Sequence, residues 1–489
     1  MKYQTLPARP TGPTPSTDSR WNCTGLRYRL LSGRWSGDLE QELRRHLPAD
    51  RRAIVGEKDM SSNVLRSCCQ ALAALYDTAP SVAHDENIDQ LIGRDALLDR
   101  AGLWPLMAQL QYYLLGTNEC LLRIDIANNE PGLKYRIVIP NSVYATQPTT
   151  ATEPDYLYEL RVRTARDGSP IWTADVFDLR DKNDPKYQVR AVQMNGDLGD
   201  DLTEHYFGSE TSGDLYPYRD KNNAPYMPYS IYHRKITGQL WNPYENEEVA
   251  RGSLVSATML TMWGHIVKNA SWPQRYVAGL TLPVGAYDID NSARRAAIST
   301  DPSSILCFVA DPSSEGIGQT MIGQFQAGGD PEKILNSIVV YNRALCQMMG
   351  IQSGDVTRLA GDPRSGYSLS ISRESTRENQ RKQSICMRYG DKQTLAISAK
   401  LANRFLGTNL PETGYRMEYN SVPLSPEELK AQREDIISKL QAGLMDPITA
   451  ILRLYPDWDE ETAINYLTSI EEGRKRFPFM VQQQKQGSF

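Results

Sequence analysis

The chain has 489 residues, of which 40% are hydrophobic and 23% charged, and its formal net charge is −5 at pH 7. This length exceeds one ordinary hydrophobic core and predicts roughly two to four domains. The net negative charge argues against a protein that binds DNA tightly, because affinity for phosphates comes from a basic surface. The seven cysteines form no CxxC pair, so we expect reduced thiols.

Residues 1–22 are rich in Pro, Thr and Ser and lack the apolar core of a secretory signal, so we expect a mobile arm. No apolar run approaches the roughly 18 residues of a membrane span, and no membrane partner is expected.

Residues 23–244 predict an α+β domain. Helical periodicity begins after Ser61 or Ser62, either of which can cap a helix, and continues to Pro80. A further amphipathic helix would end at Gly116. Strands of one antiparallel meander should follow. The helices are predicted at 38–46, 61–80 and 103–115, and the strands at 120–126, 135–140, 155–164, 171–178 and 187–192.

Two long helices are predicted on either side of an insert. The first spans 245–273, with acidic residues in its first turn, and Gly252 lies inside it. The insert, 274–329, should contain short strands. The second helix spans 330–349, with Asp330 as its N-cap and Pro331 as its first residue.

The remaining chain predicts a loop and more helices. The loop, 350–366, has no periodicity, and a long polar helix from Ser370 should end at Gly407. A short strand is expected at 416–419. Small helices should then begin at Ser425, Asp446 and Asp459.

No local motif predicts a catalytic residue, a cofactor site or a metal site. Gly361 to Ser368 mimics the glycine spacing of a phosphate-binding loop, but Tyr367 stands where the lysine is needed, and no strand precedes it. The pair Asp288 and Asp290 could hold a divalent ion, although such pairs are common in loops.

An arginine row lies on the predicted long polar helix. Its members are four residues apart and therefore share one face, with two glutamates beside them. The row would form salt bridges within its own helix, pair with a neighbouring subunit or contact phosphates, and the sequence leaves these alternatives open. The residues are Arg373, Arg377 and Arg381, with Glu374 and Glu378.

The order of these elements resembles the portal proteins of tailed bacteriophages over roughly residues 55–475. The resemblance is carried by QYYLLGTNECLLRIDI, by NPYENEEVARGSLVSA before the first long helix, by SGYSL in MMGIQSGDVTRLAGDPRSGYSL, and by AGLMDPITA near the end. The extended strand region between 150 and 225 departs from the family pattern.

The resemblance implies a portal-like α+β fold. Residues 1–22 would be an arm, 23–244 the first part of an α/β wing, 245–273 and 330–349 the two stem helices, and 274–329 an inserted α/β clip. Residues 350–366 would be a channel loop, 367–423 the long helix and return strand of the wing, and 424–489 a helical crown with its tail.

The resemblance also implies a function. The chain would form a ring, usually of about twelve copies, at the portal vertex of a virion assembled in the host cytoplasm. Double-stranded DNA would pass through it with weak, non-specific contact. Its partners would be the terminase large subunit, which would hydrolyse ATP, the major capsid and scaffolding proteins, and a head–tail adaptor. Candidates for contact with the DNA are Asp355, Thr357, Arg358 and Arg364.

Two other classes of function stay open. Another capsid-associated structural protein would not need a closed ring. An enzyme would need a pocket that gathers titratable residues distant in sequence. The portal interpretation predicts that the chain itself is not an enzyme.

Overall fold

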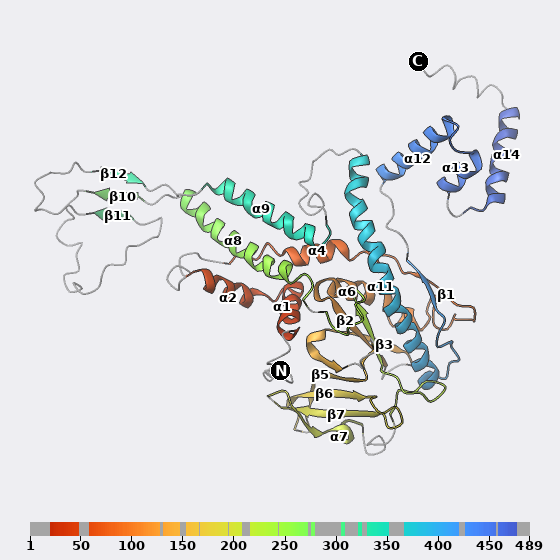
Figure 1. The fold of residues 1–489 in the computed structure, drawn as a ribbon, viewed down its shortest axis with the longest axis horizontal. Coiled ribbons are helices and arrows are strands. Elements are labelled where there is room, and N and C mark those ends of the chain that lie inside the picture. Colours follow the sequence, from red (N-terminus) through yellow and green to blue (C-terminus); the bar gives the residue numbers. More distant parts are fainter. Residues whose placement is uncertain are drawn as a thin grey trace, which may run out of the picture. The chain divides into compact units, whose positions relative to one another are not determined.

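The computed structural model divides the chain into a larger unit, residues 1–357 and 376–421, and a smaller unit, residues 358–375 and 422–489. Figure 1 shows a chain that mixes helices with sheets, as the α+β prediction requires. The structure describes residues 20–47, 58–127, 131–146, 153–165, 167–193, 195–207, 216–242, 244–271, 275–278, 305–308, 321–324, 330–351, 366–419, 426–455 and 458–476.

The first helix of the larger unit corrects the predicted arm. Helix α1 (Arg20–Ser32) already includes residues 20–22, which we assigned to the arm. Arg27 is only 1% exposed and donates a 2.7 Å hydrogen bond to the Glu245 carbonyl. A buried arginine on the inner face of the helix conceals its amphipathic pattern. Helix α2 (Ser36–His46) follows, as predicted.

Helix α4 (Val64–Leu72) is shorter than predicted. Its N-cap is Asn63, whose side chain accepts from the Arg66 N–H, rather than Ser61 or Ser62. Beyond Leu72 the chain leaves the helix, because the Leu75 N–H donates to the side chain of Gln111 and Leu75 enters a different part of the core.

Helix α6 (Leu103–Thr117) continues through Gly116, which we predicted as its end. A Cβ at Gly116 would lie 2.6 Å from Leu31 Cδ1, so this glycine permits α1 to pack closely against α6. The short helix α5 (Leu97–Arg100) precedes it.

The predicted single meander is wrong, because the strands form two sheets. One has the order β3-β2-β9, and β9 returns from far along the chain to pair with β2. The other is an antiparallel meander in the order β4-β5-β6-β7-β8. The strands are β2 (Glu119–Ile126), β3 (Leu133–Val138), β4 (Val143–Thr146), β5 (Tyr156–Thr164), β6 (Pro170–Asp178), β7 (Lys186–Val192), β8 (Leu198–Asp201) and β9 (Tyr229–His233), with η1 (Pro140–Ser142) and α7 (Thr203–Phe207).

Helices α8 (Glu247–Ser271) and α9 (Pro331–Met348) are the two predicted long helices, and they pack side by side in Figure 1. Asp330 caps α9, as predicted, by accepting from the N–H groups of Glu332 and Lys333. Between them in sequence lie β10 (Arg275–Ala278), β11 (Ile305–Phe308) and β12 (Met321–Gln324), which pair in the order β11-β10-β12.

Helix α11 (Gly366–Leu406) ends before Gly407, whose φ is +67°, as the glycine predicted. Its residues 376–406 belong to the larger unit, where β1 (Ser81–Ala83) pairs with β13 (Arg416–Glu418). Buried residues of α11 join one core with α6, β2 and β3.

The smaller unit contains α12 (Pro426–Gln441), α13 (Pro447–Leu454) and α14 (Glu460–Arg476). The predicted caps at Asp446 and Asp459 are confirmed, since their carboxylates accept from the N–H groups of Thr449 and Thr462. The predicted cap Ser425 lies outside the described residues.

Candidate functional site

Several of the predicted site residues lie outside the described part of the chain. Asp355, Thr357, Arg358 and Arg364 lie outside the described residues, as do Asp288 and Asp290. Their predicted roles remain predictions.

The predicted arginine row is described from position 377 onward. The Arg381 side chain is exposed, and Glu378 forms a 2.7 Å ion pair with Lys382 one turn along the same helix. The Lys382 ammonium holds the pKa of Glu378 below its usual value. Arg373 and Glu374 lie on α11, but their side chains are outside the described part. Glu378 thus has a partner within its own helix.

The main candidate surface is the hairpin formed by α8 and α9. The Trp263 indole N–H donates to the Pro331 carbonyl at 2.8 Å, near one end of the hairpin. Toward the other end, a Cβ on Gly252 would lie 2.6 Å from Leu345 Cδ2. The two helices are therefore antiparallel and so close that a side chain at position 252 would have to displace Leu345.

Hydroxyl groups on α8 hydrogen-bond to α4 and to the segment just before it, in the larger unit. The Leu65 N–H donates to Ser253 Oγ at 3.0 Å, and the Asp59 N–H donates to Thr261 Oγ1 at 3.0 Å. The side chains of Ser62 and Ser256 also share a 2.8 Å hydrogen bond. These directional contacts fix both the rotation and the position of α8 along its axis.

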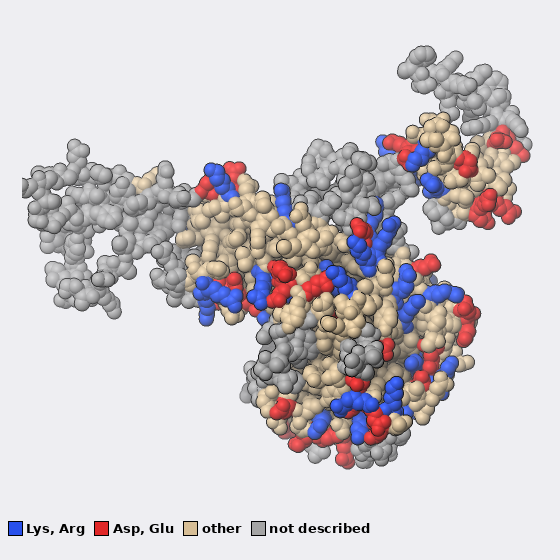
Figure 2. Space-filling model, viewed as in Figure 1, with Lys and Arg blue, Asp and Glu red and all other residues tan. Residues whose placement is uncertain are grey.

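The middle of the hairpin carries no formal charge. On α8 no Asp, Glu, Lys or Arg occurs between Arg251 and Lys268, and on α9 none occurs between Lys333 and Arg343. Figure 2 shows the face of this region toward the viewer as mostly tan. Two apolar side chains of α9 are nevertheless exposed, Val340 by 63% and Met348 by 58%. Such a surface can pack against protein but cannot hold phosphates by charge.

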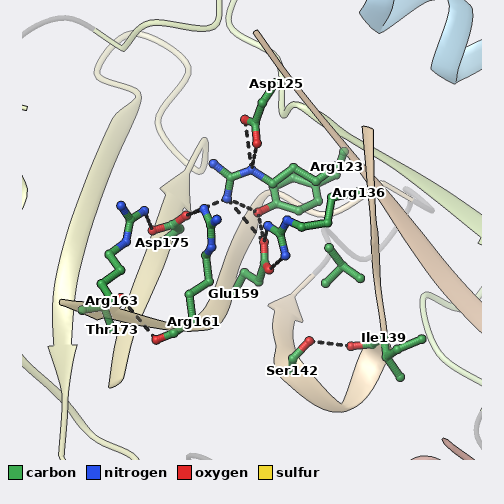
Figure 3. Close-up of polar contacts among 12 residues, drawn as sticks. Arg123, Asp125, Arg136, Ile139, Ser142, Glu159, Arg161, Arg163, Thr173 and Asp175 are labelled. Atoms are coloured by element: carbon green, nitrogen blue, oxygen red, sulfur yellow. Dashed lines mark hydrogen bonds and ion pairs between the residues drawn. The ribbon is translucent and has the colours of Figure 1, made fainter. Parts of the chain in front are cut away.

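A buried ion network joins the two sheets and fixes their relative position (Figure 3). From β2, the Arg123 guanidinium contacts Asp175 of β6 at 2.6 Å and Glu159 of β5 at 3.3 Å. Arg161 and Arg163 also bind Asp175, at 3.0 and 2.6 Å. Burial alone would raise the pKa of Asp175, but the three guanidinium groups outweigh it and hold the pKa below its usual range. Both buried carboxylates, Asp175 and Glu159, have guanidinium partners within the network, so we interpret it as structural.

A second buried carboxylate anchors α11. Asp391 accepts hydrogen bonds from the hydroxyls of Tyr76, Tyr232 and Tyr419, at 2.7, 3.0 and 2.5 Å. Complete burial raises the pKa of Asp391 to about 6, although the three hydroxyls act in the opposite direction. The cluster connects α11 to three separate segments of the larger unit.

Within the described residues, no three His, Cys, Asp or Glu side chains gather in a way that could hold a metal ion. None of the described helices combines the length and hydropathy that crossing a bilayer requires.

Comparison with known proteins gives structural similarity only. No protein-family model and no curated protein sequence matches the chain. One similar structure is a chain from the virion of a native gene transfer agent (GTA) particle, with 12% sequence identity and a TM-score of 0.37 over 83% of this chain and 93% of that chain. Another is from the neck of an empty GTA particle computed with C6 symmetry, with 11% identity and a TM-score of 0.41 over 79% of this chain and 88% of that chain. The function must therefore be inferred from this chain's own residues and contacts.

Proposed function

We propose that the chain is a portal subunit, which forms a ring at one capsid vertex through which double-stranded DNA enters and leaves. The observation that carries the proposal is the antiparallel α8–α9 hairpin, which brackets the small sheet β11-β10-β12 in sequence and precedes the long helix α11. This order supports the stem, clip and wing that the sequence resemblance implies.

The lack of charge on the hairpin supports a channel that DNA passes through rather than a site that binds DNA tightly. Basic side chains that neutralise phosphates release counterions and bind DNA tightly, which would stop a moving duplex. The uncharged middle of α8 and α9 offers no such grip. Contact with DNA would then be weak and non-specific.

The exposed apolar side chains of α9 support assembly. Val340 and Met348 are eight residues, or about 2.2 turns, apart along the helix, so they lie within one broad face. Burying them against a neighbouring copy would remove apolar surface from water. We propose that this face is part of the contact between subunits.

We also propose that the chain is not an enzyme and that ATP hydrolysis belongs to the terminase partner. Tyr367 stands where a phosphate-binding loop would need lysine, and this substitution supports the proposal. The scaffolding, capsid and adaptor partners belong to the same proposal.

Native mass spectrometry and negative-stain electron microscopy test the ring. About twelve copies of the chain would give a closed ring near 660 kDa with a central hole. The double variant Val340→Glu, Met348→Glu should shift the ring to monomers while the helix content stays unchanged. Ile236→Glu, at another exposed apolar residue of the larger unit, should leave the ring intact. A chain that stays monomeric even with a scaffolding partner would contradict the proposal.

A further inference from the structure

A pocket of about 630 Å³ lies among α1, α4 and α6 of the larger unit, and the proposed function does not use it. This size is that of sites that take small ligands or a few side chains of a peptide. Its apolar lining comes from Leu31, Ala73, Pro105 and Ala108, and its polar lining from Tyr28, Ser32, Arg34, Arg66, Gln70, Gln109, Tyr112 and Tyr113.

Three tyrosine rings form an aromatic wall of this pocket. The ring centroids of Tyr28 and Tyr113 are 5.7 Å apart, and those of Tyr112 and Tyr113 are 5.4 Å apart. The Tyr112 hydroxyl donates to the Leu31 carbonyl at 2.8 Å, which fixes its ring. Burial raises the pKa of Tyr112 to about 12, so the hydroxyl stays protonated at neutral pH. The three rings add apolar surface to the lining of the pocket.

Two guanidinium groups line the same pocket. A Cβ on Gly33 would lie 3.6 Å from Arg66 Nη1, so the Arg66 guanidinium lies beside the turn that leads into Arg34. Both arginines are exposed, and neither forms an ion pair with a described carboxylate. Among the described lining residues none is acidic.

Two guanidinium groups that line one pocket, with no acidic side chain among the lining residues, would attract a ligand anion. Guanidinium groups match carboxylates bidentately, and a tyrosine wall favours proline or aromatic side chains. A continuous DNA duplex fits this arrangement poorly, because its phosphates lie on a convex rod while the aromatic wall lines a concave pocket.

We infer that this pocket binds an acidic segment of a partner protein that presents a carboxylate next to a proline or tyrosine side chain. Arg34 and Arg66 bind the carboxylate, and Tyr28, Tyr112 and Tyr113 pack against the neighbouring side chain. The inference goes beyond the proposed ring and does not depend on it.

Fluorescence anisotropy with three probes tests the inference on the full-length chain. The probes are a fluorescein-labelled peptide of Asp, Pro and Tyr, the same peptide with Asn in place of Asp, and a labelled DNA duplex. The acidic peptide should bind with a Kd below about 1 mM, and the Asn peptide should bind at least about tenfold more weakly. Arg34→Gln with Arg66→Gln should weaken the acidic peptide by a similar factor, whereas Arg388→Gln, at an exposed arginine of α11, should not.

Hydrogen exchange provides a second readout that does not depend on a substitution. Saturating acidic peptide should slow amide exchange in the segments that line the pocket, 66–73 and 105–113. Equal binding by the double variant, a preference for the duplex, or no saturable binding up to about 1 mM would each overturn the inference. The ring-disrupting Val340→Glu, Met348→Glu variant should still bind the peptide, so the two proposals can fail separately.

Discussion

Gly252 of α8 lies directly against Leu345 of α9, where a Cβ would come within 2.6 Å of Leu345 Cδ2. The contact accounts for a glycine inside a long helix, where it costs about 1 kcal/mol relative to alanine. Close helix packing offsets that cost, and the position is therefore sensitive to any added side chain.

Gly252→Val should destabilise the chain by about 1–3 kcal/mol, because the added atoms overlap Leu345. Thermal unfolding followed by circular dichroism measures the effect. Gly264→Ala is the matched control, since nothing lies within 4 Å of its Cβ position on the same helix. That control should stabilise by up to about 1 kcal/mol. Adding Leu345→Ala should recover part of the loss in the Gly252→Val variant, and equal effects at both glycines would contradict the close approach.

Arg123→Met should destabilise the larger unit by about 3–5 kcal/mol, because it removes the central cation from buried Asp175 and Glu159. Urea unfolding measures the change. Arg180→Met is the control, since its ion pair with Asp178 is exposed and contributes at most about 1 kcal/mol. A cost for Arg123→Met no larger than that of the control would show that water compensates the buried charges.

Asp391 should make stability depend on pH. Its folded pKa of about 6 lies above the ordinary aspartate value of 3.8, so the folded state holds the proton more tightly than the unfolded state. The stability this adds is fully present below the unfolded pKa and is lost as the pH rises toward about 6. Relative to the wild type, Asp391→Asn should therefore gain about 2–3 kcal/mol of unfolding free energy between pH 4 and pH 7.

Urea titrations of both proteins across that range measure the difference. Asp89→Asn, at an exposed aspartate, should run parallel to the wild type. If the Asp391→Asn curve also runs parallel, Asp391 does not titrate in this window.

Cys68 and Cys346 should form a disulfide within one chain when a two-electron thiol oxidant such as diamide is added. Their sulfur atoms are 3.8 Å apart in the core between α4 and α9. Loss of two protons and two electrons to diamide would join them. Non-reducing peptide mapping should detect the linked peptides, and Cys346→Ser should abolish them. Cys120→Ser is the control and should leave the link intact; linkage of other cysteines alone would contradict the prediction.

The sequence predicted the long helices well because their signals are local. Asp330 before Pro331, and Gly407 after the last turn of α11, act within a few residues of the helix end. Five strands, β2, β3, β5, β6 and β7, were predicted individually for the same reason, through alternating side chains over short spans, whereas β4, β8 and β9 were not predicted.

Sequence could not predict what depends on distant partners. The end of α4 at Leu72 depends on the hydrogen bond from the Leu75 N–H to the distant Gln111 side chain. The division of the strands into two sheets depends on the pairing of β9 with β2. The pocket of Arg34 and Arg66 also needs three helices to meet. The buried network left one local signal, since Arg123 and Asp125 interrupt the apolar run 120–126 of β2, but its partners on β5 and β6 are visible only in the fold.

The hydroxyl contacts of α8 have a consequence for symmetry. In a closed ring, the rotation from each copy to the next must be the same, and an error of a few degrees at each subunit interface would leave a gap or an open spiral. A helix held only by apolar contacts can rotate slightly at little cost, whereas the bonds from Leu65 to Ser253 and from Asp59 to Thr261 break if it does. In the proposed ring, these hydroxyls would set the angular precision with which successive copies close the circle.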